Sequence, residues 1–407
     1  MNSMPQRLTF SARTAWDISE TELARAITER RQRGLPLLDL TASNPTRCGF
    51  IYDEPAILSP LSNRDSLTYD PDPRGMLRAR EAVAGYYADH GASVDPANLV
   101  LTTSTSEAYS YLFHLLCDPG DEVLIAQPSY PLFDFLAQLE NVRLVPYPLF
   151  YDHGWHIDAE SLRRQITART RAIALVHPNN PTGHFTKDEE RQELEALCAE
   201  HGLALIVDEV FLDYSIAGHT GRSFSSGPHP VLTFVLSGLS KIAALPQMKA
   251  AWIAAFGPEP VRSHALDRLE VIGDTFLSMN APIQCALPNW LADRTSLQNQ
   301  ISRRVENNLR SLDSLIASQR MISRLEVEAG WYAVLRVPAL MSGERLAVRL
   351  VREHGLSIHP GYFFGFSGNG WLVPSLLTPE NELQAGIEVL SRFFNRIGDD
   401  HEGCYQV

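Results

Sequence analysis

Residues 172–208 read AIALVHPNNPTGHFTKDEERQELEALCAEHGLALIVD, and this stretch decides the fold. It begins and ends with short apolar runs of strand length, at 172–177 and 204–208. Between them, residues 187–201 have the spacing of apolar and polar side chains that is typical of a helix. Strand, helix and strand in this order predict a parallel βαβ unit, since parallel neighbours need a crossover connection.

The same alternation extends through the centre of the chain, because three further apolar runs of strand length lie at 98–103, 121–126 and 231–237. Beyond Arg294 the sequence changes to long polar stretches with helical spacing, and a last helical stretch lies at 380–396. We therefore expect an α/β fold in which helices cover both faces of a mostly parallel sheet.

The length of the chain predicts two lobes. One hydrophobic core seldom serves more than about 250 to 300 residues, and this chain has 407. We expect a large domain at 51–294 and a smaller α+β domain assembled from 1–50 and 295–407. No flexible linker separates them, so a cleft between the lobes is the expected site.

Composition narrows the class of protein. Hydrophobic residues make up 44% and charged residues 20% of the chain, as in ordinary globular proteins. No run approaches the roughly 20 apolar residues of a membrane helix, and the start, MNSMPQRLTFSARTAWD, lacks the features of a secretory signal. The net charge of −13 disfavours nucleic acids and anionic membranes as partners, because both are bound through clustered lysine and arginine. The cytoplasm is the expected location.

Cysteine and histidine give no sign of a metal site or a disulfide framework. The five cysteines are far apart and never form a CxxC pair, and the 13 histidines show no HExxH spacing. We expect reduced thiols and no bound metal. The cysteines are Cys48, Cys117, Cys198, Cys285 and Cys404.

Residues that can take part in chemistry follow the ends of the predicted strands, where ligands bind in open parallel sheets. Lys241 stands on a small-residue turn after the run 231–237, and a lysine partly removed from water can attack an aldehyde to form a Schiff base. Asp208 ends another run, where it can cap a helix or hold a positive partner such as a protonated ring nitrogen. Taken alone, such a lysine is more often an ordinary surface residue.

Two turns complete this set. Residues 178–183 read PNNPTG, in which two prolines fix the backbone while the asparagine amides point above the sheet. Ser104, Thr105 and Ser106 open a helix after the run 98–103, so hydroxyls and free N–H groups meet at a helix N-terminus, which suits a phosphate. The alternatives are a plain turn for the first and simple capping by Ser104 for the second.

The combination resembles the class I and II aminotransferases, which are fold-type I enzymes dependent on pyridoxal phosphate. The resemblance covers nearly the whole chain, from about Leu38 to about Leu390. Each motif falls in the predicted strand or loop context, and their order and spacing together identify the family. The motifs are SNPT at 43, YDPDPRG at 69, the strand and turn at 99–108, DPGDEVLIAQPSYP at 118, HPNNPTG at 177, VDEVF at 207, SGLSK at 237 and HPGYFFGF at 359.

The resemblance implies a role for each matching position. Lys241 would form the Schiff base with pyridoxal 5'-phosphate and later move the proton between the substrate Cα and the cofactor. Asp208 would pair with the pyridine nitrogen, and Asn180 would donate to the phenolic oxygen. The resemblance also implies a homodimer with shared active sites. The other implied cofactor contacts are Tyr130 on the ring face, Ser104, Thr105, Ser106, Ser240 and Lys249 at the phosphate, and Tyr69 at the phosphate of a neighbouring subunit.

Two positions near the cofactor depart from the family pattern. Phe211 stands where relatives usually have a tyrosine whose hydroxyl donates to the phenolic oxygen, and phenylalanine cannot donate. We therefore expect a higher pKa of the Schiff base than in relatives with tyrosine. Lys249 replaces an arginine that grips the phosphate, so the charge is kept but the bidentate fork is lost.

A third departure concerns the substrate. Relatives usually bind the substrate α-carboxylate with an arginine in the strand after HPGYFFGF, and this position is Val373 here, or alternatively Pro374. Neither side chain can bind a carboxylate. Asn44 and Arg47, in and just after the SNPT loop, are the candidate substrate residues; Arg47 would replace the missing arginine, or it is a solvated loop residue. Three further aromatic residues border the site in relatives and are assigned no role: Tyr332, Tyr362 and Phe364.

The predicted function is the transfer of an amino group between an amino donor and a 2-oxo acid, with the cofactor on Lys241. The alternative is a lyase for C–S cleavage or β-elimination, or another reaction at Cα, because the same residues serve these reactions and the arginine is missing. A regulatory protein that only binds the cofactor is less favoured, because Lys241 and Asp208 are both present and no DNA-binding segment is attached.

Overall fold

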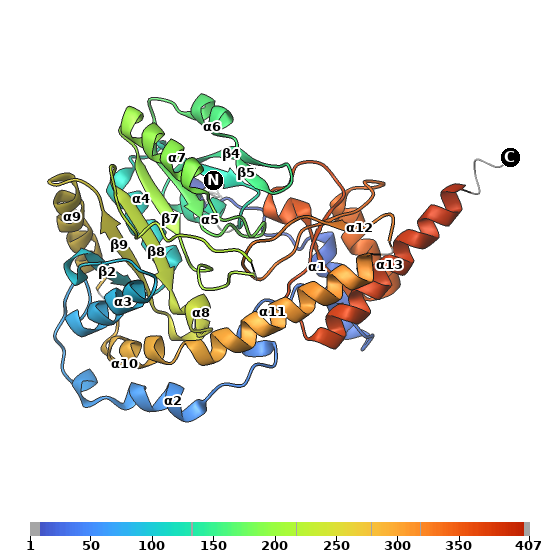
Figure 1. Cartoon of the computed structure of the whole chain (residues 1–407), viewed down its shortest axis with the longest axis horizontal. Helices are drawn as coiled ribbons and strands as arrows, with labels where there is room; N and C mark the ends of the chain where they lie inside the picture. The colour runs from blue at the N-terminus through green and yellow to red at the C-terminus, as the bar shows by residue number, and fades with distance from the viewer. Residues whose placement is uncertain (1–8, 132, 217, 278, 318, 403–407) are drawn as a thin grey trace, which may run out of the picture.

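Two lobes make up the chain, a large one around a central sheet and a smaller one that carries the longest helices (Figure 1). The computed structural model describes residues 9–131, 133–216, 218–277, 279–317 and 319–402, with the backbone alone for 397–402, and Cys404 lies outside these ranges. Within them, no helix is both long and apolar enough to cross a membrane.

The large lobe is built around an eight-stranded sheet with the order β2-β9-β8-β7-β6-β3-β4-β5. The strands β8, β7, β6, β3 and β4 run parallel to one another, whereas β9 is antiparallel to β2 and β8, and β5 is antiparallel to β4. The expectation of a mostly parallel sheet is therefore confirmed. The strands are β2 (Leu99–Thr102), β3 (Glu122–Gln127), β4 (Arg143–Tyr151), β5 (Trp155–Ile157), β6 (Thr170–Val176), β7 (Ala204–Asp208), β8 (Thr233–Gly238) and β9 (Ala251–Phe256).

Both faces of this sheet are buried, because alternate residues of a strand enter different cores. In β7, Leu205 and Val207 belong to one core, and Ala204 and Ile206 belong to the other. Helices therefore cover both faces, as the apolar runs predicted. The first core includes α3 (Leu77–Asp89), α6 (Ala159–Gln165), α7 (Asp188–His201) and α10 (Ala281–Ala292), and the second includes α4 (Thr105–Leu116), α5 (Phe133–Leu139) and α9 (Val261–Thr275).

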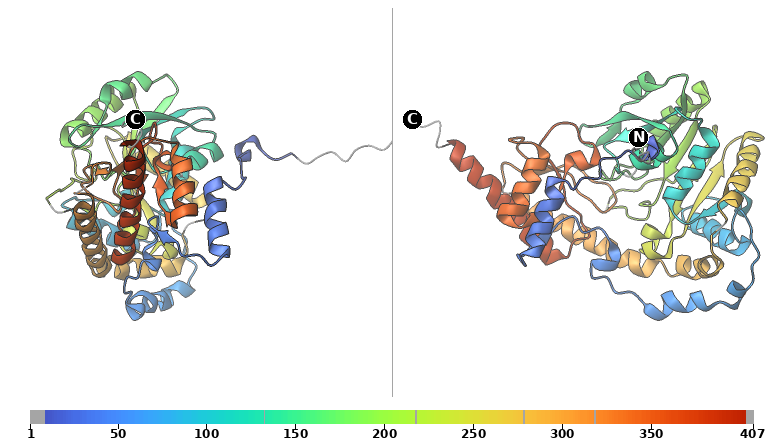
Figure 2. Two further views of the ribbon diagram at one scale, coloured as in Figure 1. Left: turned by 90° about the vertical axis from the view of Figure 1, so that its right-hand side faces the viewer. Right: turned by 180° about the vertical axis from the view of Figure 1, so that it is seen from behind.

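The small lobe combines both ends of the chain. Near the N-terminus, α1 (Glu22–Gln32) contacts α12 (Gly343–Arg349), and β1 (Leu38–Asp39) pairs in parallel with β12 (Leu356–Ser357). The long helices α11 (Thr295–Ile316) and α13 (Glu380–Glu402) lie side by side, as Figure 2 shows. An antiparallel sheet of order β10-β11-β14-β13 completes the lobe. Its strands are β10 (Ser323–Arg324), β11 (Leu335–Arg336), β13 (His359–Pro360) and β14 (Trp371–Val373).

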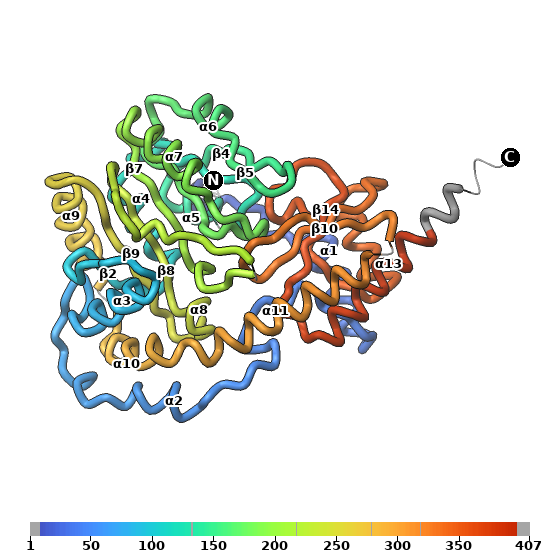
Figure 3. The backbone as a smooth tube through the Cα atoms, viewed as in Figure 1, coloured from blue at the N-terminus to red at the C-terminus, as the bar shows by residue number. Residues whose placement is uncertain are grey.

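The two lobes meet beyond the carboxyl ends of the parallel strands. The backbone after β10 reaches the large lobe (Figure 3), where Ala329 forms an antiparallel bridge with Ser215. On the other side, Ser129 after β3 donates a backbone hydrogen bond of 2.9 Å to the carbonyl of Phe364. These contacts close the edge of the sheet at which Lys241 and Asp208 lie.

Candidate active site

Lys241 lies directly after β8, in the short helix α8 (Leu239–Ile242). Its ammonium stands 4.8 Å from the centre of the Trp331 ring and 5.4 Å from that of Phe211. Burial among these rings lowers the pKa of Lys241 to about 8, against the opposing effect of the Asp208 carboxylate. A lysine with a lowered pKa is available as the neutral amine, the form that attacks an aldehyde.

Asp208 ends the neighbouring strand β7 and is 6% exposed. Burial raises its pKa to about 7, although the Val210 backbone N–H, which donates to Oδ1 at 3.1 Å, and the Lys241 charge act in the other direction. The hydroxyl of Tyr109 is also close enough to lower this pKa, but it has no hydrogen-bond partner in the structure. Asp208 is thus a buried carboxylate that a positive ring nitrogen would stabilise.

Asn180 lies in the turn after β6, which is closed by hydrogen bonds within itself. The Gly183 N–H donates to the Asn179 carbonyl at 2.8 Å, and the Thr182 hydroxyl donates to Asn179 Oδ1 at 2.8 Å. Asn180 is 8% exposed, and its buried Oδ1 has no hydrogen-bond partner among the described residues. Of the two ends of this amide only the nitrogen can donate, so the nitrogen is the atom that would meet a phenolic oxygen.

The expected phosphate turn opens α4. The hydroxyl of Ser104 accepts a hydrogen bond of 3.1 Å from the Glu107 N–H, so Ser104 has the capping role that was its alternative. Thr105 and Ser106 occupy the first turn, where backbone N–H groups have no partner inside the helix. These N–H groups suit an anion.

Two further predicted residues flank Lys241. Ser240 precedes it in α8 and is partly exposed. Lys249 is exposed, and the next residue, Ala250, accepts a 2.9 Å hydrogen bond from the Leu239 N–H, so Lys249 stands near the turn that carries Ser240.

Tyr130 follows β3 and is 43% exposed. It is close enough to Tyr332 to raise the pKa of that residue, which burial and Tyr130 together bring to about 12. Ser43 of the SNPT loop opposes this rise through its hydroxyl. The SNPT loop, the loop after β3 and the small lobe therefore meet around Tyr332.

Three predicted residues are exposed in the single chain. Tyr69 is 84% exposed. Arg47 is exposed; its backbone N–H donates to the Asn44 carbonyl at 2.9 Å, and its guanidinium makes no ion pair or hydrogen bond with the described residues. Asn44 is exposed as well, and its Oδ1 caps the short helix at Pro45–Arg47 by accepting from the Thr46 N–H at 3.1 Å.

The position of the missing arginine is a core position. Val373 is fully buried in β14, where it pairs with His359 of β13. Its neighbour Pro374 accepts a backbone hydrogen bond of 3.2 Å from Ala333. Neither residue offers a charged group to the site.

Two residues at the site carried no signal that we read from the sequence. Trp331 lies over Lys241 and packs edge-on against Phe211 and Tyr214, with ring centres 5.2 and 4.9 Å apart. The hydroxyl of Tyr214 donates to the Lys241 carbonyl at 2.6 Å and fixes the backbone there. The family pattern places only the neighbour of Trp331, Tyr332, at the border of the site. Tyr214 shows no pattern that separates it from a core tyrosine.

The arrangement fits the expected cofactor. An amine of lowered pKa, a buried carboxylate and a buried amide follow three adjacent parallel strands, β8, β7 and β6, in that order. These are the groups that an aldehyde carbon, a protonated ring nitrogen and a phenolic oxygen require.

Comparison with known proteins agrees with this geometry. The sequence model of the family "Aminotransferase class I and II" matches residues 56–390. The chain is 25% identical over 372 residues to a glutamate-pyruvate aminotransferase of Haemophilus influenzae, covering 89% of this chain and 92% of that protein. It is 28% identical over 379 residues to an arginine-pyruvate transaminase of Pseudomonas aeruginosa, with 90% of each covered.

A solved structure shows the same fold. An alanine aminotransferase from Pyrococcus furiosus superimposes with a TM-score of 0.87 at 21% identity, over 95% of this chain and all of that chain. The matching relatives do not favour the lyase alternative. The chain belongs to the class I and II aminotransferase family and is a transaminase dependent on pyridoxal 5'-phosphate.

Proposed function

We propose that Lys241 binds the aldehyde carbon of pyridoxal phosphate, Asp208 its ring nitrogen and Asn180 its phenolic oxygen. The observation that carries this proposal is the placement of Lys241 and Asp208 at the carboxyl ends of the adjacent strands β8 and β7, where each is close enough to shift the pKa of the other. Tyr130 would cover the ring. The phosphate would be held at Thr105, Ser106, Ser240 and Lys249, and by Tyr69 of the second subunit.

The bound cofactor supplies an electron-withdrawing ring that stabilises negative charge at the substrate Cα. Lys241 supplies the proton transfer, because a displaced amine with a pKa near 8 is partly neutral at neutral pH and can accept and return a proton. Trp331 and Phe211 cover part of that amine with their ring faces and so limit its contact with water. Phe211 has no hydroxyl, so Asn180 is the main donor to the phenolic oxygen.

The donor is an amino acid and the acceptor a 2-oxo acid in this proposal, by analogy with relatives named for glutamate, arginine, alanine and pyruvate. Since Val373 cannot hold the α-carboxylate, we assign that role to Arg47. Its guanidinium has no ionic partner within the described ranges, and it lies four residues from Ser43, whose hydroxyl is near Tyr332. Asn44 contributes its free amide nitrogen.

A homodimer is part of the same proposal. The segments around Pro73 and Gly273 lie against each other, so close that a Cβ at position 273 would be 2.9 Å from the Pro73 carbonyl oxygen. Both segments carry exposed apolar side chains, which support an interaction surface here: Leu67, Tyr69, Leu77, Val271, Phe276 and Leu277.

Domain boundaries and location complete the proposal. The pairing of β1 with β12 supports a small domain of 1–50 and 295–407 beside a large domain of 51–294. Cys48, Cys117, Cys198 and Cys285 are free thiols, which supports a cytoplasmic location.

The test is to add single amino acids to the purified holoenzyme and follow the cofactor absorbance. Conversion of the cofactor to its amino form, reversed by a 2-oxo acid, is expected. Release of ammonia and a 2-oxo acid without that conversion would indicate elimination. For the carboxylate, Arg47→Ala should raise KM for amino donors at least about tenfold, by analogy with other lost charge-assisted contacts, while Arg47→Lys retains part of the affinity. An unchanged KM in Arg47→Ala would refute the role of Arg47.

A further inference from the structure

A segment of the small lobe, residues 325–331, docks onto the loop that carries Asn180. Glu328 accepts a backbone hydrogen bond of 2.8 Å from Ile216, and Gly330 donates one of 2.8 Å to Tyr214. At Gly183 the approach is so close that a Cβ would lie 2.4 Å from the Ala329 carbonyl oxygen. The loop and the docked segment are therefore held as one unit.

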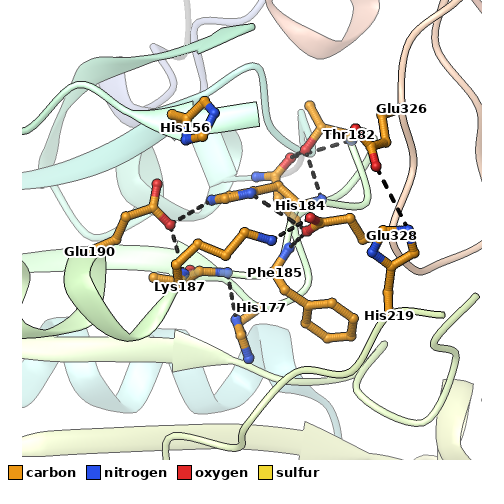
Figure 4. Close-up of polar contacts among 12 residues, drawn as sticks. His156, His177, Thr182, His184, Phe185, Lys187, Glu190, His219, Glu326 and Glu328 are labelled. Atoms are coloured by element: carbon orange, nitrogen blue, oxygen red, sulfur yellow. Dashed lines mark hydrogen bonds and ion pairs between the residues drawn. The ribbon is translucent and has the colours of Figure 1, made fainter. Parts of the chain in front are cut away.

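The side chain of Glu328 contacts three residues of the large lobe across this junction (Figure 4). The Phe185 N–H donates to its Oε2 at 2.7 Å, and the Lys187 ammonium pairs with its Oε1. His184 Nδ1 stands 3.8 Å from Oε2. The carboxylate is only 13% exposed, so these contacts are little weakened by water.

A second carboxylate, which belongs to the large lobe, holds the same stretch, residues 184–187. Glu190 Oε2 lies 3.0 Å from His184 Nε2 and accepts the Lys187 N–H at 2.7 Å. Burial would raise the pKa of Glu190, but the His184 hydrogen bond and charge, with the backbone N–H groups, hold it below its ordinary value. His184, 2% exposed, thus lies between a carboxylate of each lobe.

Both ends of this junction lead to the cofactor residues. On one side, the His184 carbonyl accepts a 2.8 Å hydrogen bond from the Asn179 N–H and closes the turn that contains Asn180. On the other side, Trp331 follows Glu328 by three residues, and its ring stands 4.8 Å from the Lys241 ammonium.

The positions of the lysines in the sequence also single out this junction. Among the 35 lysine and arginine residues there are three lysines, at positions 187, 241 and 249. Lys241 and Lys249 belong to the cofactor motifs, and Lys187 is the partner of Glu328. All the other residues of this group of 35 are arginine. Lysine therefore occurs only in the cofactor motifs and at this junction.

We propose that Glu328 is a positioning residue, which fixes Trp331 against Lys241 and the Asn180 turn against the small lobe. It lies outside the residues to which the proposed function assigns contact with cofactor or substrate. Its effect is exerted on the amine of Lys241, which stays shielded from water only while Trp331 is held in place. This inference rests on the proposed roles of Lys241 and Asn180.

The experiment uses the full-length apoprotein and the small number of lysines. Trace acylation of amines at a series of pH values, followed by peptide mass spectrometry, gives a separate labelling midpoint for each lysine. Glu328→Ala should move the Lys241 midpoint upward by about one pH unit as water reaches the amine, and should weaken pyridoxal phosphate binding about tenfold. Lys249 should not change and serves as the internal reference.

Two variants sharpen the comparison. Glu328→Gln keeps an acceptor for the Phe185 N–H but loses the charge, so its shift should be intermediate. Glu326→Ala is the matched control, because this residue of the same segment is 44% exposed and lies 3.8 Å from His219 alone among the described cations. It should behave as the unmodified protein.

The proposal fails if Glu328→Ala lowers only the unfolding midpoint and leaves the Lys241 midpoint and the cofactor affinity equal to those of Glu326→Ala. If Glu328→Ala does not fold, the Lys241 midpoint and the cofactor affinity are measured in Lys187→Met instead. This variant removes the ion pair with Glu328 and leaves the hydrogen bond from the Phe185 N–H. If Lys241 of the unmodified protein takes up no cofactor, the proposed function is contradicted. The labelling of the apoprotein would still test the role of Glu328, because it needs no cofactor.

Discussion

Lys241 is expected to destabilise the apoprotein, and replacing it with methionine tests this. Its pKa falls from 10.5 to about 8 because burial disfavours the charged form. One pKa unit corresponds to about 1.4 kcal/mol, so the penalty approaches about 3 kcal/mol below pH 8. Methionine has a similar length and no charge to bury. Removing Lys241 also leaves Asp208 without a cationic neighbour, which offsets part of the stability gained when the buried charge is removed. We therefore expect Lys241→Met to stabilise the apoprotein by about 1 to 2 kcal/mol at pH 7.

The stability difference between the two proteins should also depend on pH, and this dependence is a more specific test. Between pH 8 and 10.5 the unfolded chain binds more protons at Lys241 than the folded chain does, so this residue makes the unmodified protein gain stability as pH rises. The advantage of Lys241→Met should therefore be largest below pH 8 and disappear towards pH 10.5. Urea denaturation midpoints of the two apoproteins across this range provide the measurement. Lys249→Met, at an exposed lysine, is the control and should change little. An advantage that is absent at pH 7, or that does not decline with pH, would refute the reasoning.

Three other substitutions follow from the same contacts. Gly183→Ala should cost about 2 to 3 kcal/mol in urea denaturation and weaken cofactor binding, since the added Cβ would meet a carbonyl oxygen at 2.4 Å with φ at +73°; Gly202→Ala, at a similar φ in open space, should cost about 1 kcal/mol. If Gly183→Ala loses no more free energy of unfolding than Gly202→Ala, the docked segment moves to make room for the added Cβ. Phe211→Tyr should lower the pKa seen in the cofactor absorbance, because the hydroxyl adds a donor to the phenolic oxygen; an unchanged titration would contradict this. Asp208→Asn should lower the pKa of Lys241 in apoprotein labelling, because the carboxylate raises it, and should weaken cofactor binding at least about tenfold; a higher Lys241 midpoint would reverse the assigned sign.

The sequence predicted the parts of the fold that depend on local pattern. The helix expected at 187–201 begins one residue later, at Asp188, and the strand expected at 204–208 has those bounds. The last helix extends to Glu402, beyond the expected 396. Strand ends in a parallel sheet meet at one edge, so the positions of Lys241 and Asp208 could be inferred from order along the chain alone.

The remainder of the site depends on contacts between distant segments, and no local pattern encodes these. Trp331 reaches Lys241 only because residues after β10 dock onto the large lobe. From the sequence alone, Glu328 would be taken for a surface residue, because its partner, the Phe185 N–H, comes from a distant segment. The single chain also leaves Tyr69 and Arg47 exposed, so their proposed roles depend on a second subunit and a substrate.

The central claim is that Lys241 carries the cofactor, and one measurement tests it directly. Borohydride reduction of the holoenzyme fixes pyridoxal phosphate to the amine that holds it, and peptide mass spectrometry then identifies that amine among the three lysines and the N-terminus. The label is expected on the peptide that contains Lys241, and Lys241→Met should take up none. A label on Lys187 or Lys249, or equal labelling of Lys241→Met, would contradict the account.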